Sequence, residues 1–477
     1  MPIETTQSSR WYAGVTRYQW LVLLIASLGW VFDVFEGQIF VASMKEAMPS
    51  LVEKDTAEGA IAHYNNIALG AFLLGGATGG IVFGMLSDRI GRKRTMSLTI
   101  LFYSVFTCVS AFSQEWWHLA GFRFLVAMGV GGEWAVASSM VAEVFPKRAR
   151  AHVGGIFHAS SVFGTYLAVL AGVFIIGNPH IHGYAEGVGM PSLPWRLGFA
   201  VGAFPALLIL WIRTTLREPE SWQEARTRAQ ADPSRQMGAI RDLFRGELLR
   251  HTFIGVTLAA VGLATFWGAH IYGKDVLHAA VERSYIADAR GVHADLTPEE
   301  TEAVLTTHRV SLKRWEMLGM FLVTTGGGLG LVSFGPICER IGRRGAFLLF
   351  HLGGVTSALI LYQMLEGVPA LFVALPIFGF LTLGMHAGYA IYFPELYPTR
   401  LRGTGTGFCF NAGRILAAPI LFVSGWMQKD WGFTLENAAT ILSLLFLLGA
   451  LLLLLAPETR GRDLPDDDVP VPDRPKA

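Results

Sequence analysis

Long apolar segments recur along the chain at the length that crosses a lipid bilayer. A spanning helix needs about 20 mostly apolar residues. Unbroken runs such as 441–455 do not show the alternating ten-residue strands of a membrane barrel, so they predict helices. We expect an all-α integral membrane protein with twelve transmembrane helices. The predicted spans are 18–43, 64–86, 95–113, 116–141, 152–177, 195–216, 252–274, 314–334, 345–365, 368–393, 403–427 and 434–456.

The polar connections give the orientation of these helices. Basic residues concentrate in the loops after the second, fourth and eighth spans, while the short loops after the third, fifth and ninth hold almost none. Loops rich in Lys and Arg stay on the cytoplasmic side, and an even number of spans returns the chain to that side. We therefore expect both termini in the cytoplasm and the protein in the inner or plasma membrane.

This topology divides the chain into two helical bundles with four polar segments. The bundles are expected at 18–216 and 252–456. The polar parts are an N-terminal segment 1–17, a basic linker 217–251 and a tail 457–477, all cytoplasmic, and an extracytoplasmic loop 275–313. Within that loop, Thr297 followed by Pro-Glu-Glu indicates the start of a helix.

Composition agrees with a lipid environment and excludes several functions. Hydrophobic residues make up 52% of the 477 positions and charged residues 16%, against about 25% charged in soluble domains. A net charge of +1 gives no reason to expect nucleic acid as a partner. Three cysteines without metal or disulfide spacing predict neither a metal site nor a disulfide. We find no nucleophile elbow or phosphate-binding loop, so we expect neither an enzyme nor an ATP-driven pump.

Two polar motifs occur twice. An acid followed by Arg-Ile-Gly-Arg stands at Asp88 and again at Glu339, 251 positions later. Glu143 begins Glu-x-x-Pro-x-Arg, and Glu395 begins the same pattern 252 positions later. Two independent motifs with nearly the same offset indicate duplication of a six-helix unit, with parallel halves related by an axis along the membrane normal.

These motifs resemble those of the major facilitator superfamily, over nearly the whole chain. The pattern Gly84-x-x-x-Asp88-Arg-x-Gly-Arg-Lys is highly specific to that family. The segments beginning at Arg217 (Arg-Glu-Pro-Glu-Ser-Trp) and Pro457 (Pro-Glu-Thr-Arg-Gly) look like the end-of-half signatures of its sugar-porter and metabolite:proton symporter branches. The resemblance implies transport of a small molecule by alternating access, as a functional monomer.

Three further features indicate which branch of this superfamily the chain resembles. Asp33-x-x-Glu36 resembles the acidic pair of aromatic-acid and metabolite proton symporters. Gly-Gly-Glu133-Trp is similar to a motif of the metabolite:proton and sialate or lactate branch. The seventh span lacks the Gln-Gln pair that sugar porters usually carry, which argues against a hexose as the substrate.

The repeated loop motifs have two readings. The acids and cations can form ion pairs that latch a cytoplasmic gate, or the cations can merely set the topology. The matching acid in each half favours the latch. The predicted gating residues are Gly84, Asp88, Arg89, Gly91, Arg92, Glu143, Arg148, Glu339, Arg340, Gly342, Arg343, Glu395 and Arg400.

Ionisable residues inside the spans are functional candidates because their burial in lipid is costly. Asp33 lies roughly 22 Å from the cytoplasmic end of its helix and Arg123 roughly 10 Å below the outer face. These depths nearly coincide, so we expect the two to pair, with Glu36 about one turn farther out. Asp33 or Glu36 then either couples transport to protons or belongs to a permanent structural ion pair.

Arg414 and Asn411 lie near mid-membrane in the eleventh span. The guanidinium offers a planar donor fork for a substrate carboxylate, unless it pairs with a protein acid such as Glu133 or Glu316. Five other candidates for the site, gating or coupling are Glu133, Trp267, His270, His386 and Tyr389.

The sequence predicts a secondary transporter, and proton symport of a small organic acid is the leading reading. No cofactor is expected, because the proton gradient supplies the energy. A porter for sugars or other neutral solutes, and a receptor derived from a transporter, are the alternatives. A channel would not explain a duplicated gating motif.

Overall fold

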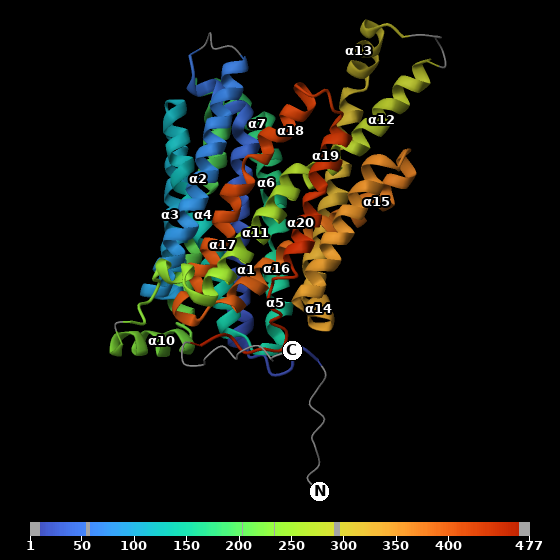
Figure 1. The fold of residues 1–477 in the computed structure, drawn as a ribbon. Coiled ribbons are helices and arrows are strands. Elements are labelled where there is room, and N and C mark those ends of the chain that lie inside the picture. Colours follow the sequence, from blue (N-terminus) through green and yellow to red (C-terminus); the bar gives the residue numbers. More distant parts are fainter. Residues whose placement is uncertain (1–9, 54–57, 203, 233, 291–295, 467–477) are drawn as a thin grey trace. The chain divides into compact units, whose positions relative to one another are not determined.

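The computed structural model describes residues 10–53, 58–202, 204–232, 234–290 and 296–466. Across these residues the chain forms helices and no β-strand (Figure 1). This confirms the all-α class expected from the apolar runs.

Twenty α-helices make up the described chain, joined by short 3-10 turns and one π-helical turn at 172–176. Their bounds are α1 Arg17–Ala47, α2 Glu58–Ile90, α3 Arg92–Ser110, α4 Trp116–Val144, α5 Lys147–Ala159, α6 Ser161–Ala171, α7 Pro179–Gly187, α8 Leu193–Val201, α9 Ala206–Thr215, α10 Glu220–Ala231, α11 Gly246–Gly268, α12 Gly273–Arg290, α13 Pro298–Thr307, α14 Arg309–Gln363, α15 Val368–Leu383, α16 His386–Leu396, α17 Arg402–Ala417, α18 Ile420–Lys429, α19 Leu435–Ser443 and α20 Leu445–Leu452.

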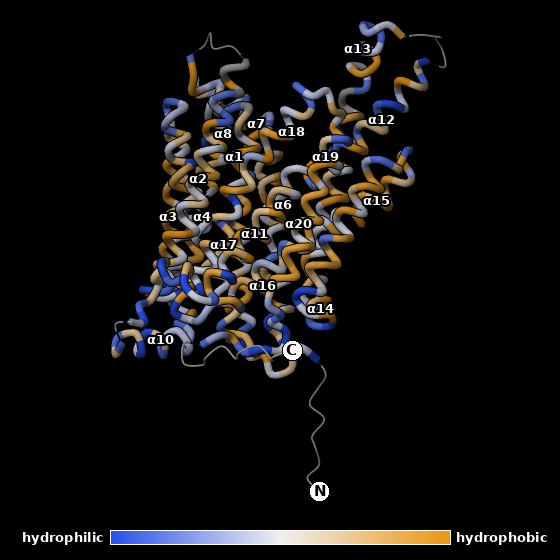
Figure 2. Tube along the Cα trace, in the orientation of Figure 1, coloured by the Kyte–Doolittle hydropathy of each residue, from blue (hydrophilic) through white to orange (hydrophobic). Residues whose placement is uncertain are grey.

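Every predicted span coincides with helix, although not one for one. Among the described residues, nine helical stretches are long and apolar enough to cross a membrane. One of them, 311–363, contains two predicted spans. The predicted spans 95–113 and 195–216 fall outside the nine, because α3 begins with three basic residues and α8–α9 is short and interrupted. Figure 2 shows hydrophobic positions along the helices and hydrophilic ones in α10.

Two glycines end helices at the repeated loop motif. Gly342 interrupts α14 with φ of 84°, and Gly91 separates α2 from α3 with φ of 113°. A residue with a Cβ is strained at such positive φ values. The motif therefore requires glycine at this point in each half, and the new helix starts at the following arginine.

Five predicted spans are broken near their middle into two helices. The breaks are α5/α6, α8/α9, α15/α16, α17/α18 and α19/α20. Pro205 and Pro419 stand at the starts of α9 and α18. Proline lacks the N–H that would continue the preceding ladder, so the interruptions follow from the sequence at these two places.

The chain forms two compact units. The first comprises 1–256, 389–415 and 459–477, and the second comprises 257–388 and 416–458. The first unit therefore contains all of α1–α10 together with most of α16 and α17. The division of the chain at 18–216 and 252–456 stays a prediction.

The linker 217–251 and the predicted extracytoplasmic loop 275–313 contain helices of their own. The linker 217–251 carries α10, whose Trp222 donates a hydrogen bond to the Asp88 carbonyl in the first unit. At α13, Thr297 and Glu300 form a reciprocal capping box. This confirms the helix start predicted at Thr297.

Candidate functional site

Three carboxyl groups lie buried in the first unit, where α1, α3 and α4 meet. Asp33 and Glu36 come from α1 and Glu133 from α4, and each is at most 1% exposed. Glu36 accepts a hydrogen bond from the Thr107 hydroxyl at 2.7 Å, and Glu133 accepts one from Thr99 at 2.5 Å. The second oxygen of each has no hydrogen-bond partner among the described residues. We call Asp33, Glu36 and Glu133 the acid cluster.

Asp33 makes the fewest hydrogen bonds of the three carboxyl groups. Neither of its oxygens accepts a hydrogen bond from a described residue. Glu133 and Glu36 are close enough to act on it electrostatically, and both carry the same sign of charge. An unpaired buried carboxylate is costly, so Asp33 is the member of the acid cluster that most lacks stabilising partners among the described residues.

The predicted ion pair between Asp33 and Arg123 is wrong, because no such pair occurs among the described residues. Arg123 instead donates to the backbone carbonyl of Glu36 at 2.8 Å. Side chains tilt toward the N-terminus of their own helix, and α1 and α4 run in opposite directions. Two residues at equal depth therefore diverge, and Arg123 meets the residue one turn farther along α1. Three rings lie 4.7–5.7 Å from its guanidinium: Phe40, Phe72 and Phe199.

A second charged cluster joins the end of α2 to the starts of α3 and α17. Arg92 contacts Asp88 at 2.5 Å and Glu143 at 2.8 Å, and Arg402 contacts the same Glu143 oxygen at 2.8 Å. All four side chains are fully buried. We call Asp88, Arg92, Glu143 and Arg402 the latch cluster.

Asp88 also caps the start of α17. Its carboxylate accepts hydrogen bonds from the backbone N–H groups of Gly403 and Thr404, at 3.0 and 2.8 Å, and from the Thr404 hydroxyl. A carboxylate at a helix N-terminus satisfies orphan donors and complements the helix dipole. The latch cluster thus ties a loop of the first half to a helix of the second.

Arg402 is the one member that the sequence analysis missed. The motif Glu-x-x-Pro-x-Arg pointed to Arg148 and Arg400, but Arg148 is exposed and Arg400 pairs with Asp242 at 2.7 Å. The arginine that matters stands two residues after the end of this motif in each half. Arg150 and Arg402 occupy equivalent positions in the two halves, and the Nε of each donates at 3.0 Å to a carbonyl eight residues earlier.

The second unit repeats part of this geometry. Glu339 pairs with Arg343 at 2.7 Å, as Asp88 does with Arg92. Glu458 accepts from the backbone N–H groups of Arg343 and Arg344. Glu218 does the same for Lys93 and Arg94 in the first unit. The start of a helix after the positive-φ glycine is therefore capped by an end-of-half glutamate in each half.

The remaining predicted gating residues occupy varied places. Arg89 donates to the carbonyls of Met237 and Gly238 in the linker, and Glu395 accepts from the Thr459 hydroxyl at 2.6 Å. Arg340 is exposed. Gly84 lies against the backbone of Gly403, so a larger residue would separate α2 from α17.

Arg414 has no acidic partner among the residues that the structure describes. It is half-buried in the first unit and lies over the Phe410 ring at 5.2 Å. It makes no hydrogen bond or ion pair with any described residue, Glu133 and Glu316 included. Asn411 is fully buried, and its amide N–H donates to the Gly407 carbonyl at 2.9 Å within its own helix. Its side-chain oxygen has no hydrogen-bond partner among the described residues.

Five aromatic side chains adjoin Arg414, and we call Trp30, Trp134, His158, Tyr389 and Phe410 the aromatic wall. Of these, the sequence analysis singled out Tyr389 alone. Phe410 stacks on Trp134 with centroids 4.2 Å apart. The Trp134 indole N–H points to the His158 ring at 3.2 Å, and Trp30 donates to the His158 carbonyl. Tyr389 lies within 6.3 Å of Phe410. Trp30, Trp134 and Phe410 come from apolar segments, where an aromatic residue is ordinary. Only the fold shows that these three rings lie close together.

Trp267, His270 and His386 lie in the second unit. The Phe266 ring lies between His270 and His386, at 5.0 and 5.7 Å from their centroids. His270 also contacts the Thr382 hydroxyl at 2.7 Å. Both histidines are buried, and Trp267 is partly exposed.

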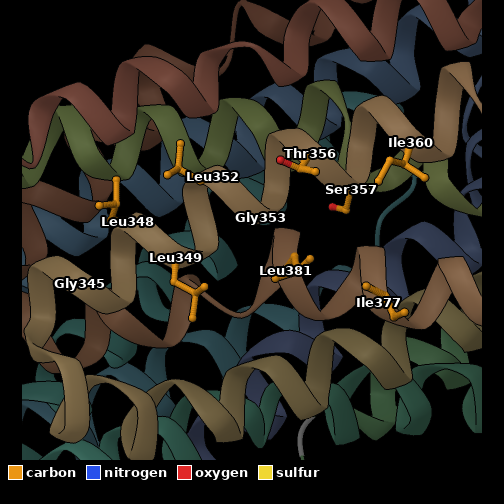
Figure 3. A pocket seen from close by; sticks show the side chains of 10 residues that line it. All are labelled: Gly345, Leu348, Leu349, Leu352, Gly353, Thr356, Ser357, Ile360, Ile377 and Leu381. Atoms are coloured by element: carbon orange, nitrogen blue, oxygen red, sulfur yellow. The ribbon is translucent and has the colours of Figure 1, made fainter.

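An open groove of about 500 Å³ runs along the second half of α14 and α15 (Figure 3). Aliphatic side chains such as Leu348, Leu352 and Leu381 line it, and its polar groups are the hydroxyls of Thr356 and Ser357. It offers no ionisable group to a charged solute. The acid cluster and Arg414 remain the candidate site.

Comparison with known proteins decides the family. The model of the Major Facilitator Superfamily matches residues 38–418. The chain belongs to the Major Facilitator Superfamily. Proteins of this superfamily are membrane transporters and not enzymes, so the chain is an integral membrane transporter of small metabolites.

Two relatives and one solved structure illustrate the similarity. The sialic acid transporter NanX of Escherichia coli is 28% identical, with 93% of this chain and 96% of that protein aligned. The niacin transporter NiaP of Acinetobacter baylyi is 24% identical, with 94% and 96% aligned. The structure of the proton:xylose symporter XylE superposes with a TM-score of 0.70 at 18% identity, over 94% of this chain and 98% of that one. The last likeness shows the fold alone, and it confirms the fold class expected from the repeated motifs.

Proposed function

We propose that this transporter carries a small organic anion together with a proton. The observation that carries the proposal is that the first unit holds a free cation and a set of buried acids. Arg414 has no acid partner among the described residues, and Asp33 has no hydrogen-bond donor there. A binding group for an anion and a carrier for a proton are the two parts that such symport requires.

Arg414 would bind the carboxylate of the substrate. Its guanidinium offers two parallel N–H donors, and the partly apolar surroundings strengthen a charge-assisted hydrogen bond. The aromatic wall beside it favours a flat or apolar body next to the carboxylate. The related proteins named for sialic acid and niacin support this choice, because both compounds are carboxylic acids.

Asp33 would carry the proton, with Glu133 and Glu36 as its neighbours. Three like charges in a space without a matching set of cations cannot all be ionised at low cost. Exposure to water on either side of the membrane removes the burial penalty and allows the proton to leave. One proton moving with one monoanion is electroneutral, so the pH gradient alone would drive accumulation.

The latch cluster would close the side of the protein on which Asp88 lies. Its four buried charges are paired in the described state, and alternating access requires that they separate when this side opens. The positive-inside rule places this side in the cytoplasm, together with both termini. No cofactor is needed, and the transporter would work as a monomer.

Uptake into proteoliposomes under separately imposed gradients tests the proposal. The probe is nicotinate, with xylose as a neutral comparison. We expect a pH gradient, acidic outside, to drive nicotinate accumulation, and a potassium diffusion potential to leave it unchanged. Asp33→Asn should abolish accumulation but retain exchange of labelled for unlabelled substrate. Arg414→Lys should weaken nicotinate binding, because Lys keeps the charge but loses the fork.

Two outcomes would overturn parts of this proposal. Accumulation by an intact Asp33→Asn protein in response to the pH gradient would remove the coupling role of Asp33. Transport of xylose in place of any carboxylate would remove the role of Arg414 and indicate a neutral-solute porter of the same fold.

A further inference from the structure

A second cavity lies at the Asp88 end of the first unit, between the linker helix α10 and the start of α3. Its volume is about 970 Å³. It is distinct from the proposed transport site, because none of its lining residues belongs to the acid cluster, the aromatic wall or Arg414. Its lining combines polar and aliphatic side chains of α3 and α10.

The two walls of this cavity are fixed to each other by hydrogen bonds. The Glu218 carboxylate, at the entry to α10, accepts from the backbone N–H groups of Lys93 and Arg94 at 3.1 and 3.3 Å. The buried Trp222 of α10 donates its indole N–H to the Asp88 carbonyl at 2.7 Å. The cavity is therefore a built feature of the docked linker helix.

Two cations with no protein acid line the cavity from opposite walls. Arg94 on α3 and Arg226 on α10 are both exposed. Neither makes an ion pair with a residue in the described part of the chain, and Arg226 lies over the Trp222 ring at 5.3 Å. Glu218 is the one acid of the lining, and its two oxygens already accept the backbone N–H groups of α3. The cavity thus presents uncompensated positive charge.

The α3 wall continues into aliphatic surface. Leu98 and Leu101 line the cavity and are 38% and 46% exposed. They lie one and two turns beyond Arg94 on a predicted membrane span, on the side of the helix that faces out of the protein. Positive charge at the end of a span and an exposed aliphatic strip directly below it are the chemistry of a lipid contact.

We propose that this cavity binds one anionic phospholipid of the leaflet on the Asp88 side. The phosphate lies between Arg94 and Arg226, and one acyl chain lies along Leu98 and Leu101. A soluble anion would satisfy the arginines but leave the aliphatic strip without a partner. A peptide is less suited to exposed leucines that lie on a predicted membrane span. A bound lipid bridges α3 and α10 and so stabilises the docked linker.

Native mass spectrometry of the purified full chain in detergent tests this site. The probes are dioleoylphosphatidylglycerol, dioleoylphosphatidylcholine and, as a soluble head-group control, glycerol 3-phosphate. Each arginine near an anionic lipid is worth about a fivefold change in binding. Arg94→Gln with Arg226→Gln should therefore weaken phosphatidylglycerol binding on the order of 25-fold. Arg94→Lys with Arg226→Lys should retain most of it.

The matched control is Arg241→Gln with Arg245→Gln. It removes two cations from the same linker, 64% and 71% exposed and outside the cavity. We expect it to bind phosphatidylglycerol as the natural chain does. Equal losses in the two Gln pairs would overturn the proposal, because they would show a general effect of charge. Equal binding of the two phospholipids, or binding of glycerol 3-phosphate as tight as that of the lipid, would also overturn it.

The variant with Arg94→Lys and Arg226→Lys serves as the control for a folding defect in the Gln variant. If the Gln pair at 94 and 226 unfolds in detergent, the Lys pair must still prefer phosphatidylglycerol over phosphatidylcholine. Loss of that preference in a folded Lys pair would contradict a site that recognises charge.

Discussion

The carboxyl groups of Glu36 and Glu133 are each half satisfied. One oxygen of each accepts a threonine hydroxyl, and the other has no partner among the residues that the structure describes. A fully bonded carboxylate would be fixed in its charged form, and a carboxyl with no donor would be costly to ionise. Each threonine therefore orients its glutamate beside Asp33, the proposed proton carrier, and leaves one glutamate oxygen without a donor.

Close packing holds Glu133 in this position. A Cβ added at Gly29 of α1 would lie 2.7 Å from a Glu133 carboxylate oxygen, so Gly29→Ala must displace that side chain. We expect Gly29→Ala to reduce accumulation driven by a pH gradient more than it reduces exchange. Gly121→Ala is the control, because nothing lies within 4 Å of its added Cβ. Equal effects of the two substitutions on both assays would contradict the role given to Glu133.

Arg402 neutralises Glu143 in a fully buried setting. Arg402→Ala leaves part of that charge uncompensated, and breaking a buried ion pair costs about 3 kcal/mol. We expect a clear fall in the apparent Tm of the purified protein in detergent. Arg148→Ala should change stability by less than about 0.5 kcal/mol, since Arg148 is exposed. A Tm for Arg402→Ala equal to that of Arg148→Ala would refute the placement of Arg402 in the latch cluster.

At the scale of the elements, glutamate and aspartate side chains control where helices begin. Asp88 caps α17, Glu218 caps α3, and Glu458 caps the second part of α14. Each acid lies far from its helix in the sequence, so each bond joins two elements as well as completing a helix end. If such a cap breaks, the capped helix can separate from the element that carries the acid.

The cap on α17 gives a prediction about turnover. Asp88→Asn keeps one carbonyl acceptor but loses the charge, and hydrogen bonds to charged groups are worth about 1.5–3 kcal/mol. We expect the rate of the transport cycle to fall about tenfold or more, with a smaller change in substrate binding. Glu339→Gln is the matched control, since Glu339 is 27% exposed and pairs with Arg343 alone among the described residues. A natural turnover rate in Asp88→Asn would argue against a gating role for the cap.

At the scale of the whole molecule, the distribution of basic residues predicts the orientation. The starts of α3 and α5, directly after α2 and α4, carry Arg and Lys, and the positive-inside rule retains these residues in the cytoplasm. A fluorescent-protein fusion after Ala477 should therefore fluoresce, and an alkaline phosphatase fusion there should be inactive. Phosphatase inserted after Gly187, at the end of α7, should be active. The opposite pattern at both sites would invert the proposed topology.

The sequence by itself determined the class, the duplication and most of the chemistry-bearing residues. Backbone in lipid must form helices or a closed barrel, and unbroken apolar runs of spanning length predict helices. The two repeated motifs, by their resemblance to those of the major facilitator superfamily, predicted the fold family. Charges inside spans are too costly to occur without a use or a partner, which singled out Asp33, Glu36, Glu133, Arg123 and Arg414 before any coordinates.

Only the tertiary structure decided which of these groups meet. Depth along two helices gave the wrong partner for Arg123, because rise per residue says nothing about side-chain direction. Arg402 was overlooked in favour of Arg400, since the two differ by two positions on a helix start and only packing shows which one is buried. The aromatic wall and the cavity under α10 depend on contacts between segments far apart in the chain. Local pattern fixes the type of an element, whereas the neighbours of its side chains follow from how the elements pack.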